Sequence, residues 1–201
     1  MNHPDQKVTG LLFGSFNPVH TGHLIIANHF VQYTRIEEVW FVLSPQNPFK
    51  TDQRMLGEKQ RLELLELAIE ENPAFIACDI ELKMKTPSYS IHTIKTLQQK
   101  HPGRQFVLLI GSDNLEAFDR WKDHEEILAL VKVYVYPRSE QPASRILSHP
   151  NVSLVHAPLL EISSAKIREA LTQGKCPRYL LPDKVLRRIE ARKHFQSRGQ
   201  C

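Results

Sequence analysis

Cysteine is scarce in this chain of 201 residues, and the three that occur, Cys78, Cys176 and Cys201, lie far apart. An odd number of widely spaced cysteines argues against a disulfide framework, and the lack of a Cys-x-x-Cys pair argues against a zinc site built on thiols. Free thiols are typical of a reducing compartment, so the composition predicts a cytoplasmic protein.

Long apolar runs are missing as well. A run such as Phe106 to Ile110 is far too short to span a bilayer, and residues 1–7 are polar and lack the core of a signal peptide. There is also no internal repeat and no low-complexity linker. With 41% apolar and 24% charged residues, the chain has the composition of a folded protein, and we expect one domain over residues 1–201 with its core at about 8–190.

A strong excess of one charge is absent too, because the formal net charge is only +4. Part of the excess falls in a C-terminal basic helix that we expect at about residues 182–197. We interpret these cations as a solvated helix face, and a patch that attracts phosphate-bearing ligands is the alternative. No nucleic-acid-binding motif and no interleaved aromatics accompany them, so we expect no nucleic-acid partner.

The two common glycine-rich phosphate loops are not found. The chain lacks the Gly-Lys-Ser/Thr ending of a Walker A loop and the three-glycine spacing of the Gly-x-Gly-x-x-Gly fingerprint. A site for nucleotide phosphates therefore needs other residues.

What is present is a regular alternation of short apolar runs with helical patterns. Helices are expected near residues 23–33, 57–71, 113–118 and 125–130, after Ser163, and from about Pro182. A further helix is expected where Ile91, Ile94 and Leu97 line one face, and Ser88 or Ser90 could cap it. The runs expected to form strands are residues 8–13, 39–43, 75–80, 105–110, 131–136 and 152–156. This order predicts a Rossmann-like, doubly wound α/β domain, with a mostly parallel sheet and helices on both faces.

In such a sheet, ligands bind beyond the carboxyl ends of the strands, where the strand order reverses. The first strand ends at Gly14, and a helix opens at Gly22 and His23. The unpaired N–H groups of that helix N-terminus suit a phosphate, and His20 and His23 can donate hydrogen bonds to it. For these residues alone, a locally satisfied pair of histidines and a metal site remain alternatives.

A second candidate segment is residues 161–168. Ser163 and Ser164 stand where a helix begins, so they can cap it and offer hydroxyls to phosphates, and Arg168 lies one turn into the helix. The alternative for this segment alone is an ordinary capped helix with an exposed arginine.

These two segments resemble the signatures of the nucleotidyltransferase α/β-phosphodiesterase superfamily. The first resembles its Gly-[Gly/Ser/Thr]-Phe-Asp-Pro-x-His-x-Gly-His pattern, and the second its Ile-Ser-Ser-Thr-x-Ile-Arg element. Between them, residues 87–93 and 109–122 are similar to elements of the bacterial nicotinate-nucleotide adenylyltransferases. The likeness extends from about residue 8 to 190 and implies adenylyl transfer from ATP to nicotinate mononucleotide, which gives nicotinate adenine dinucleotide and pyrophosphate in NAD biosynthesis.

The resemblance also implies roles for individual residues. The catalytic residues would be His20, His23, Lys50 and Arg168. ATP would be bound by those histidines and that arginine together with Gly14, Ser15, Phe16, Gly22, Gly111, Asp113, Ile162, Ser163 and Ser164. The pyridine nucleotide would be bound by Tyr89, Ser90, Trp121, Lys122 and Arg138.

The chemistry of these side chains suits the implied substrates. Trp121 offers a flat face to an electron-poor pyridinium, Ser90 and nearby N–H groups suit its carboxylate, and Asp113 suits ribose hydroxyls. Mg²⁺ is expected as a cofactor bound mainly through the ATP phosphates, since no acidic cluster suggests a protein-built metal site. The sequence leaves open whether the chain forms a homo-oligomer, and it predicts no membrane partner.

The chain departs from the family pattern at Phe13, Asn17, Phe49 and Ala165, and Ser90 replaces a threonine. Two alternatives follow from the residues that it keeps. One is another enzyme of the superfamily, a phosphopantetheine adenylyltransferase or a cytidylyltransferase, and the other is a nucleotide-binding regulator that no longer catalyses.

Overall fold

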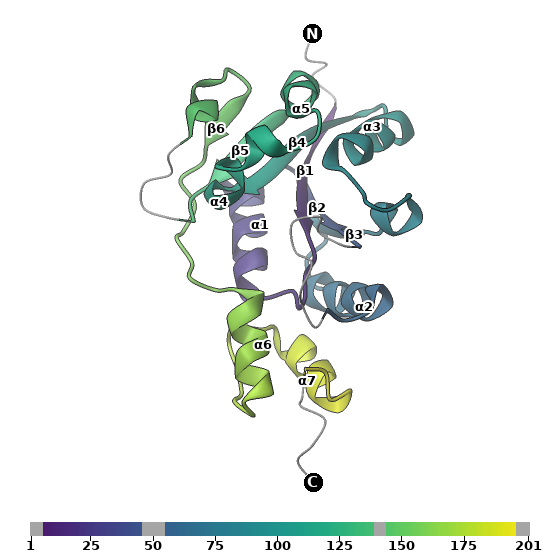
Figure 1. The fold of residues 1–201 in the computed structure, drawn as a ribbon, viewed down its shortest axis with the longest axis vertical. Helices are drawn as coiled ribbons and strands as arrows, with labels where there is room; N and C mark the ends of the chain where they lie inside the picture. Colours follow the sequence, from purple (N-terminus) through teal and green to yellow (C-terminus); the bar gives the residue numbers. More distant parts are fainter. Residues whose placement is uncertain (1–5, 46–54, 139–143, 196–201) are drawn as a thin grey trace.

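A single six-stranded sheet forms the centre of the computed structural model, which describes residues 6–45, 55–138 and 144–195 (Figure 1). Its strands are β1 (Lys7–Gly14), β2 (Glu38–Leu43), β3 (Phe75–Cys78), β4 (Arg104–Gly111), β5 (Lys132–Tyr136) and β6 (Val152–Leu154). All neighbouring strands run parallel, in the order β3-β2-β1-β4-β5-β6. The predicted doubly wound sheet is therefore confirmed, and its strand order reverses between β1 and β4.

Helices cover both faces of the sheet. One face packs against α1 (Thr21–Tyr33), α2 (Glu58–Ile69), α6 (Ser164–Thr172) and α7 (Asp183–Ala191). The other packs against α3 (Ser90–Lys100), α4 (Ser112–Leu115), α5 (His124–Leu130) and the 3-10 turns η1 (Ile80–Lys83) and η2 (Phe118–Arg120), and a third 3-10 turn, η3 (Arg145–Ser148), precedes β6.

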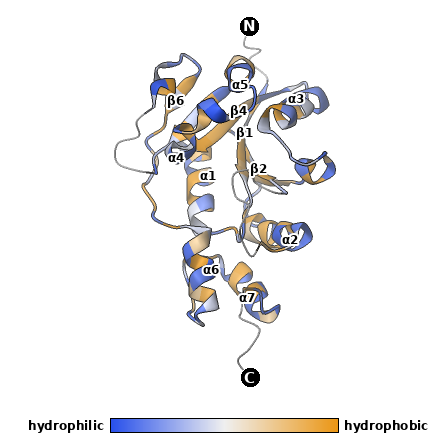
Figure 2. Cartoon of the chain, viewed as in Figure 1, coloured by the Kyte–Doolittle hydropathy of each residue, from blue (hydrophilic) through white to orange (hydrophobic). Residues whose placement is uncertain are grey.

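Buried strands account for this two-sided packing. Along β4, Val107 and Leu109 belong to the core beneath α1 and α2, whereas Leu108 and Ile110 belong to the core beneath α3 and α5. Successive strand residues point to opposite faces, so a continuous apolar run fills two cores at once. Figure 2 shows the hydrophobic colour concentrated on these strands and on the inward sides of the helices.

Several expected element boundaries were wrong. The third strand stops at Cys78, because Ile80 already begins η1, and the sixth stops at Leu154, because Ala157 N–H bonds back to the carbonyl of Val155. The helix expected over residues 113–118 is divided into α4 and η2. The C-terminal basic helix ends at Ala191 rather than near residue 197, since Lys193 adopts a left-handed backbone with φ of 53°.

The expected serine cap of α3 was wrong as well. Tyr89 occupies the position before the helix, and no side chain caps it. The Ser88 hydroxyl instead donates a 2.9 Å hydrogen bond to the Glu81 carboxylate.

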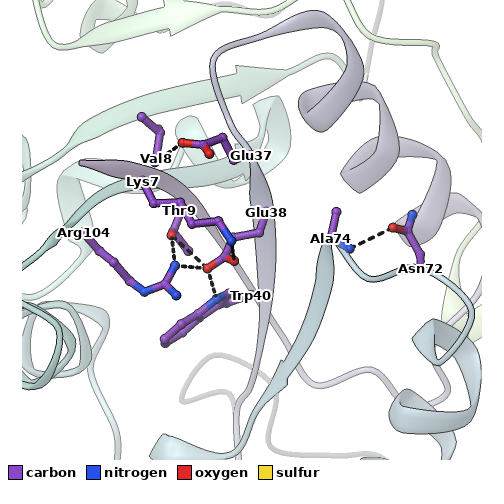
Figure 3. A network of polar contacts seen from close by, with 9 residues as sticks. All are labelled: Lys7, Val8, Thr9, Glu37, Glu38, Trp40, Asn72, Ala74 and Arg104. Carbon is purple, nitrogen blue, oxygen red and sulfur yellow. Dashed lines mark hydrogen bonds and ion pairs between the residues drawn. The ribbon is translucent and has the colours of Figure 1, made fainter. Parts of the chain in front are cut away.

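Glu38 anchors a polar network at the amino-terminal edge of the sheet (Figure 3). Its buried carboxylate accepts hydrogen bonds from Trp40 Nε1 at 2.7 Å and Thr9 Oγ1 at 3.2 Å, and it pairs with Lys7 and Arg104. Burial alone would raise the pKa of Glu38, but the hydrogen bonds from Lys7 and Trp40 and the charge of Arg104 outweigh it, so the pKa is lowered. The network joins β1, β2 and β4.

We expect Glu38→Gln to lower the free energy of unfolding by roughly 2–4 kcal/mol, because it removes the counter-charge of two cations at a buried position. Urea unfolding would measure the loss. Glu37→Gln is the matched control, since this neighbouring glutamate is exposed. Equal losses in the two variants would contradict the assigned role of the network.

Candidate functional site

A cavity of about 430 Å³ opens at the carboxyl ends of the strands. Gly14 and Ser15 from the end of β1 and Gly111 from the end of β4 line it, so it lies where the strand order reverses. This is the position at which ligands bind in open α/β sheets. The cavity is also lined by residues at the start of α3, by the last residue of η2, Arg120, and by the two residues after it.

Four of the five residues expected to bind the pyridine nucleotide line this cavity together. Tyr89 and Ser90 stand at the N-terminus of α3, and Trp121 and Lys122 follow η2. The Lys122 Nζ lies 4.7 Å from the centre of the Tyr89 ring. The cavity therefore combines flat aromatic surfaces, a hydroxyl, a helix N-terminus and a cation, which suits a planar anionic group.

Arg138, the fifth of these residues, lies elsewhere. It follows β5, its backbone N–H donates to Ser112 Oγ at 2.8 Å, and its side chain is close to Gly111. Its charge also contributes to lowering the pKa of His20. The structure thus places the Arg138 side chain beside Gly111 at the end of β4, and Arg138 is not among the residues that line the cavity.

The two histidines at the start of α1 form a stacked pair. Their ring centres are 3.6 Å apart with an interplanar angle of 19°. The His20 backbone N–H donates to His23 Nδ1 at 3.2 Å, so a neutral His23 holds its proton on Nε2. The ring of Phe16, whose φ of 42° is left-handed, contacts His23 edge-on at 5.0 Å.

His20 is buried and electrically neutral at ordinary pH. Burial above all, and then the charge of Arg138, lowers the pKa of His20 to about 4. Its Nδ1 is buried, and no group of the described residues forms a hydrogen bond with it. A buried polar atom left in this state costs free energy unless a ligand reaches it, which is a physical sign of a binding position.

Gly22 leaves room for this histidine. A Cβ at Gly22 would lie 3.1 Å from His20 Nδ1 and 3.4 Å from the Cβ of Ile162. The missing side chain thus lets the β1–α1 turn pack against both the His20 ring and the segment before α6.

The start of α6 braces that turn. Ser163 caps the helix by accepting a 3.3 Å hydrogen bond from Lys166 N–H. The Ser164 hydroxyl donates to the carbonyl of Pro18 at 2.9 Å, and Arg168 Nη1 donates to the carbonyl of Asn17 at 2.7 Å. These two side chains therefore position the turn that precedes His20.

Arg61 supports the same turn from α2. Its guanidinium, only 1% exposed, donates to the carbonyls of Ser15 at 2.7 Å, Ser44 at 2.8 Å, Pro45 at 2.9 Å and Leu56 at 3.1 Å. Burial lowers its pKa. The sequence places Arg61 in a segment that roughly matches the family, but it was given no role in the site.

Two expected residues remain, Asp113 and Lys50. Asp113 lies in the first turn of α4, and a Cβ at Gly111 would come within 2.4 Å of its Oδ1, so the glycine is required for this approach. Lys50 lies outside the described residues.

Other cavity residues were missed by the sequence analysis. These are Ser44, Glu81, Ser88, Asn114, Arg120 and Tyr136. Glu81 follows a strand, as site residues often do, and its place in the loop 81–90 was the signal that could have found it. Burial raises the pKa of Tyr136 to about 12, so its phenol remains protonated.

The described ranges contain neither a candidate metal site nor a candidate membrane span. No group of three or more His, Cys, Asp or Glu side chains within them could hold a metal ion. No helix within them is long and apolar enough to cross a membrane.

Because folded His20 resists protonation, the unfolded chain binds a proton that the native protein excludes between pH 6.5 and 4. Stability should fall as pH decreases through this window, by roughly 1.4 kcal/mol per pH unit from this group. Between pH 7 and 4.5, the free energy of unfolding of His20→Asn should fall by about 2–3 kcal/mol less than that of the parent. Urea unfolding at the two pH values would measure the difference. An equal loss in both proteins would show that His20 titrates normally.

Arg61→Lys keeps the charge but cannot reproduce the fork of hydrogen bonds. We expect it to lower the free energy of unfolding by roughly 2–4 kcal/mol and to accelerate exchange of the backbone amides of residues 14–17 and of Ser44. Lys59→Arg, at an exposed position of the same helix, should change neither quantity. Unchanged exchange in Arg61→Lys would refute its role in holding these loops.

Known proteins resemble this chain in sequence over nearly its whole length. The family model described as cytidylyltransferase-like matches residues 11–170. A probable nicotinate-nucleotide adenylyltransferase of Cytophaga hutchinsonii is 48% identical over 188 residues, which cover 94% of this chain and 98% of that protein. One of Bacteroides fragilis is 45% identical over 181 residues, 90% of each chain.

Solved structures share the fold. The Plasmodium falciparum nicotinic acid mononucleotide adenylyltransferase complexed with NaAD superposes with a TM-score of 0.78 at 18% identity, covering 94% of this chain and 97% of that one. A second structure of that enzyme, complexed with APC, superposes with a TM-score of 0.76 at 20% identity, covering 94% of this chain and 97% of that one. At such identities the likeness shows the fold alone.

Proposed function

Since this chain belongs to the nicotinate-nucleotide adenylyltransferases, within the cytidylyltransferase-like family, we propose that it transfers the adenylyl group of ATP to nicotinate mononucleotide. The products are nicotinate adenine dinucleotide and pyrophosphate, a step of NAD biosynthesis. The observation that supports this function most is the cavity at the strand reversal, where Tyr89, Ser90, Trp121 and Lys122 meet the end of β1.

The reaction is an in-line displacement at phosphorus. An oxygen of the acceptor's 5′-phosphate forms a bond to the α-phosphorus of ATP, and the bond from that phosphorus to the oxygen bridging to the β-phosphate breaks. The electron pair leaves with pyrophosphate. Because the attacking phosphate is already ionised, no general base is required, and catalysis depends on positioning and charge stabilisation.

The histidine pair acts as a neutral donor at the α-phosphate in this proposal. His23 holds its proton on Nε2, since its Nδ1 accepts the backbone N–H of His20. A donor fixed before the reaction stabilises developing negative charge without reorganisation. The N-terminus of α1 adds the positive end of its dipole at the same position.

Cations and hydroxyls from other segments complete the triphosphate site. We assign Lys50, Ser163, Ser164 and Arg168 to the β- and γ-phosphates, with Gly14, Ser15, Gly111 and Asp113 around the rest of ATP. Ser164 and Arg168 each donate a hydrogen bond to the β1–α1 turn, so part of their role is to hold the histidines in place.

Mg²⁺ enters with ATP as part of the substrate and neutralises phosphate charge. Mg²⁺ is commonly bound through substrate phosphates and waters rather than by a cage of protein side chains. We also place the reaction in the cytoplasm, where free thiols such as Cys78 and Cys176 are stable.

Loss of the His23 donor tests the mechanism. We expect His23→Ala to lower kcat/KM by roughly 10²–10³-fold, the cost of one lost donor to a developing oxyanion, with little change in stability. Pyrophosphate release from ATP, Mg²⁺ and nicotinate mononucleotide would measure it. His29→Ala, on the same helix but outside the cavity, should stay within about twofold of the parent.

The same assay distinguishes the other candidate functions. Release with phosphopantetheine but not with nicotinate mononucleotide would indicate a different adenylyltransferase. If none of the acceptors gives pyrophosphate release, the chain is a regulator that binds nucleotides without catalysis.

A further inference from the structure

Glu81 is a buried carboxylate in the wall of the cavity, at the start of η1. Its exposed fraction is 2%, and it lines the cavity together with Ser88, Tyr89 and Ser90. Its Oε2 accepts the Ser88 hydroxyl at 2.9 Å and its Oε1 accepts the Thr93 hydroxyl at 2.7 Å. Both oxygens are held in place, and both donors are neutral.

Two glutamates are buried among the described residues, and they differ in how their charge is compensated. Glu38, at the opposite edge of the sheet, pairs with Lys7 and Arg104 (Figure 3). Across residues 6–45, 55–138 and 144–195, by contrast, no cationic side chain forms an ion pair with Glu81. A buried carboxylate without a counter-ion is costly, and hydroxyl donors compensate only part of that cost.

We propose that Glu81 is a specificity-determining residue, which supplies the counter-charge for a cationic ring bound in the cavity. This inference rests on the proposed function, whose acceptor combines a pyridinium cation with a carboxylate. The start of α3 and the Lys122 ammonium suit the carboxylate, and Trp121 provides a face for the ring. Glu81 is the one acidic side chain among the described residues that line the cavity, so it is the group that favours the positive ring.

A consequence is that the cavity distinguishes acceptors by ring charge. Nicotinate mononucleotide and its 1,4-dihydro form share the ribose phosphate and the carboxylate, but the dihydropyridine ring is neutral. A charge in a poorly solvated cavity changes affinity for an opposite charge by roughly tenfold or more at distances of several ångströms. The parent protein should therefore prefer the oxidised acceptor, and this preference should depend on Glu81.

The test is Glu81→Gln, which keeps the size of the side chain and removes the charge. We expect the KM for nicotinate mononucleotide to rise about tenfold while the KM for ATP stays within twofold, and the preference for the oxidised over the dihydro acceptor to fall by a similar factor. Steady-state pyrophosphate release gives the KM for ATP, the KM for nicotinate mononucleotide and the kcat/KM for each of the two acceptors.

Two matched variants separate charge from structure. Thr93→Val removes one hydrogen bond to Glu81 and keeps its charge, and Glu125→Gln removes the same charge from an exposed position of α5. Both should retain the parent's preference for the oxidised ring.

The outcomes are distinct. An equal decrease of kcat/KM for the two acceptors in Glu81→Gln would overturn the proposal, because a purely structural role affects both rings alike. An unchanged KM for nicotinate mononucleotide would overturn it as well. Failure of the parent protein itself to use nicotinate mononucleotide would instead overturn the proposed function. Thermal unfolding of each variant confirms that a folded protein is compared.

Discussion

The turn between β1 and α1 depends on hydrogen bonds from side chains that are distant in the sequence. Its carbonyl groups at Ser15, Asn17 and Pro18 accept donors from Arg61, Arg168 and Ser164 respectively. Buried carbonyls outside regular structure require partners, and here α2 and α6 supply them. The position of the histidine pair follows from these bonds, since His20 comes directly after this turn.

This dependence explains why residues far apart in the chain form one site. The Ser164 donor lies 146 residues from its acceptor, and the Arg168 donor lies 151 residues from its own. The sheet brings them together, because α6 packs with α1 on the same face. An enzyme that relies on positioning needs such rigid support, since small displacements of a donor weaken its effect on the reacting phosphate.

Much of this architecture could be predicted from the sequence. Continuous apolar runs separated by helical patterns define a parallel doubly wound sheet, and its strand reversal defines where a ligand binds. Tyr89, Ser90, Trp121 and Lys122 were expected to share one site, and they line one cavity. Motif spacing succeeded here because each motif directly follows a strand or begins a helix.

The remaining features required three-dimensional information. Arg61 has the spacing of an ordinary helix residue, and only the loops that fold over it bury it. The Ser88 hydroxyl, a natural helix cap by sequence, turns to Glu81 because a buried carboxylate competes for the donor. Helix ends such as Ala191 depended on the backbone conformation of the residues that follow, for which the sequence offers no strong signal at Lys193.

The electrostatics of the site connect these features. Two imidazole rings stacked at 3.6 Å cannot both be charged without strong repulsion, and burial keeps His20 neutral. In the proposed function, the positive potential for a triphosphate therefore comes from fixed sources, which are helix N-termini, guanidinium groups and the Lys50 ammonium rather than titrating histidines. Arg61 contributes a buried positive charge behind Ser15, and the α1 dipole points its positive end to the same place. A site built in this way retains its charge distribution across the neutral pH range, because none of these sources titrates there.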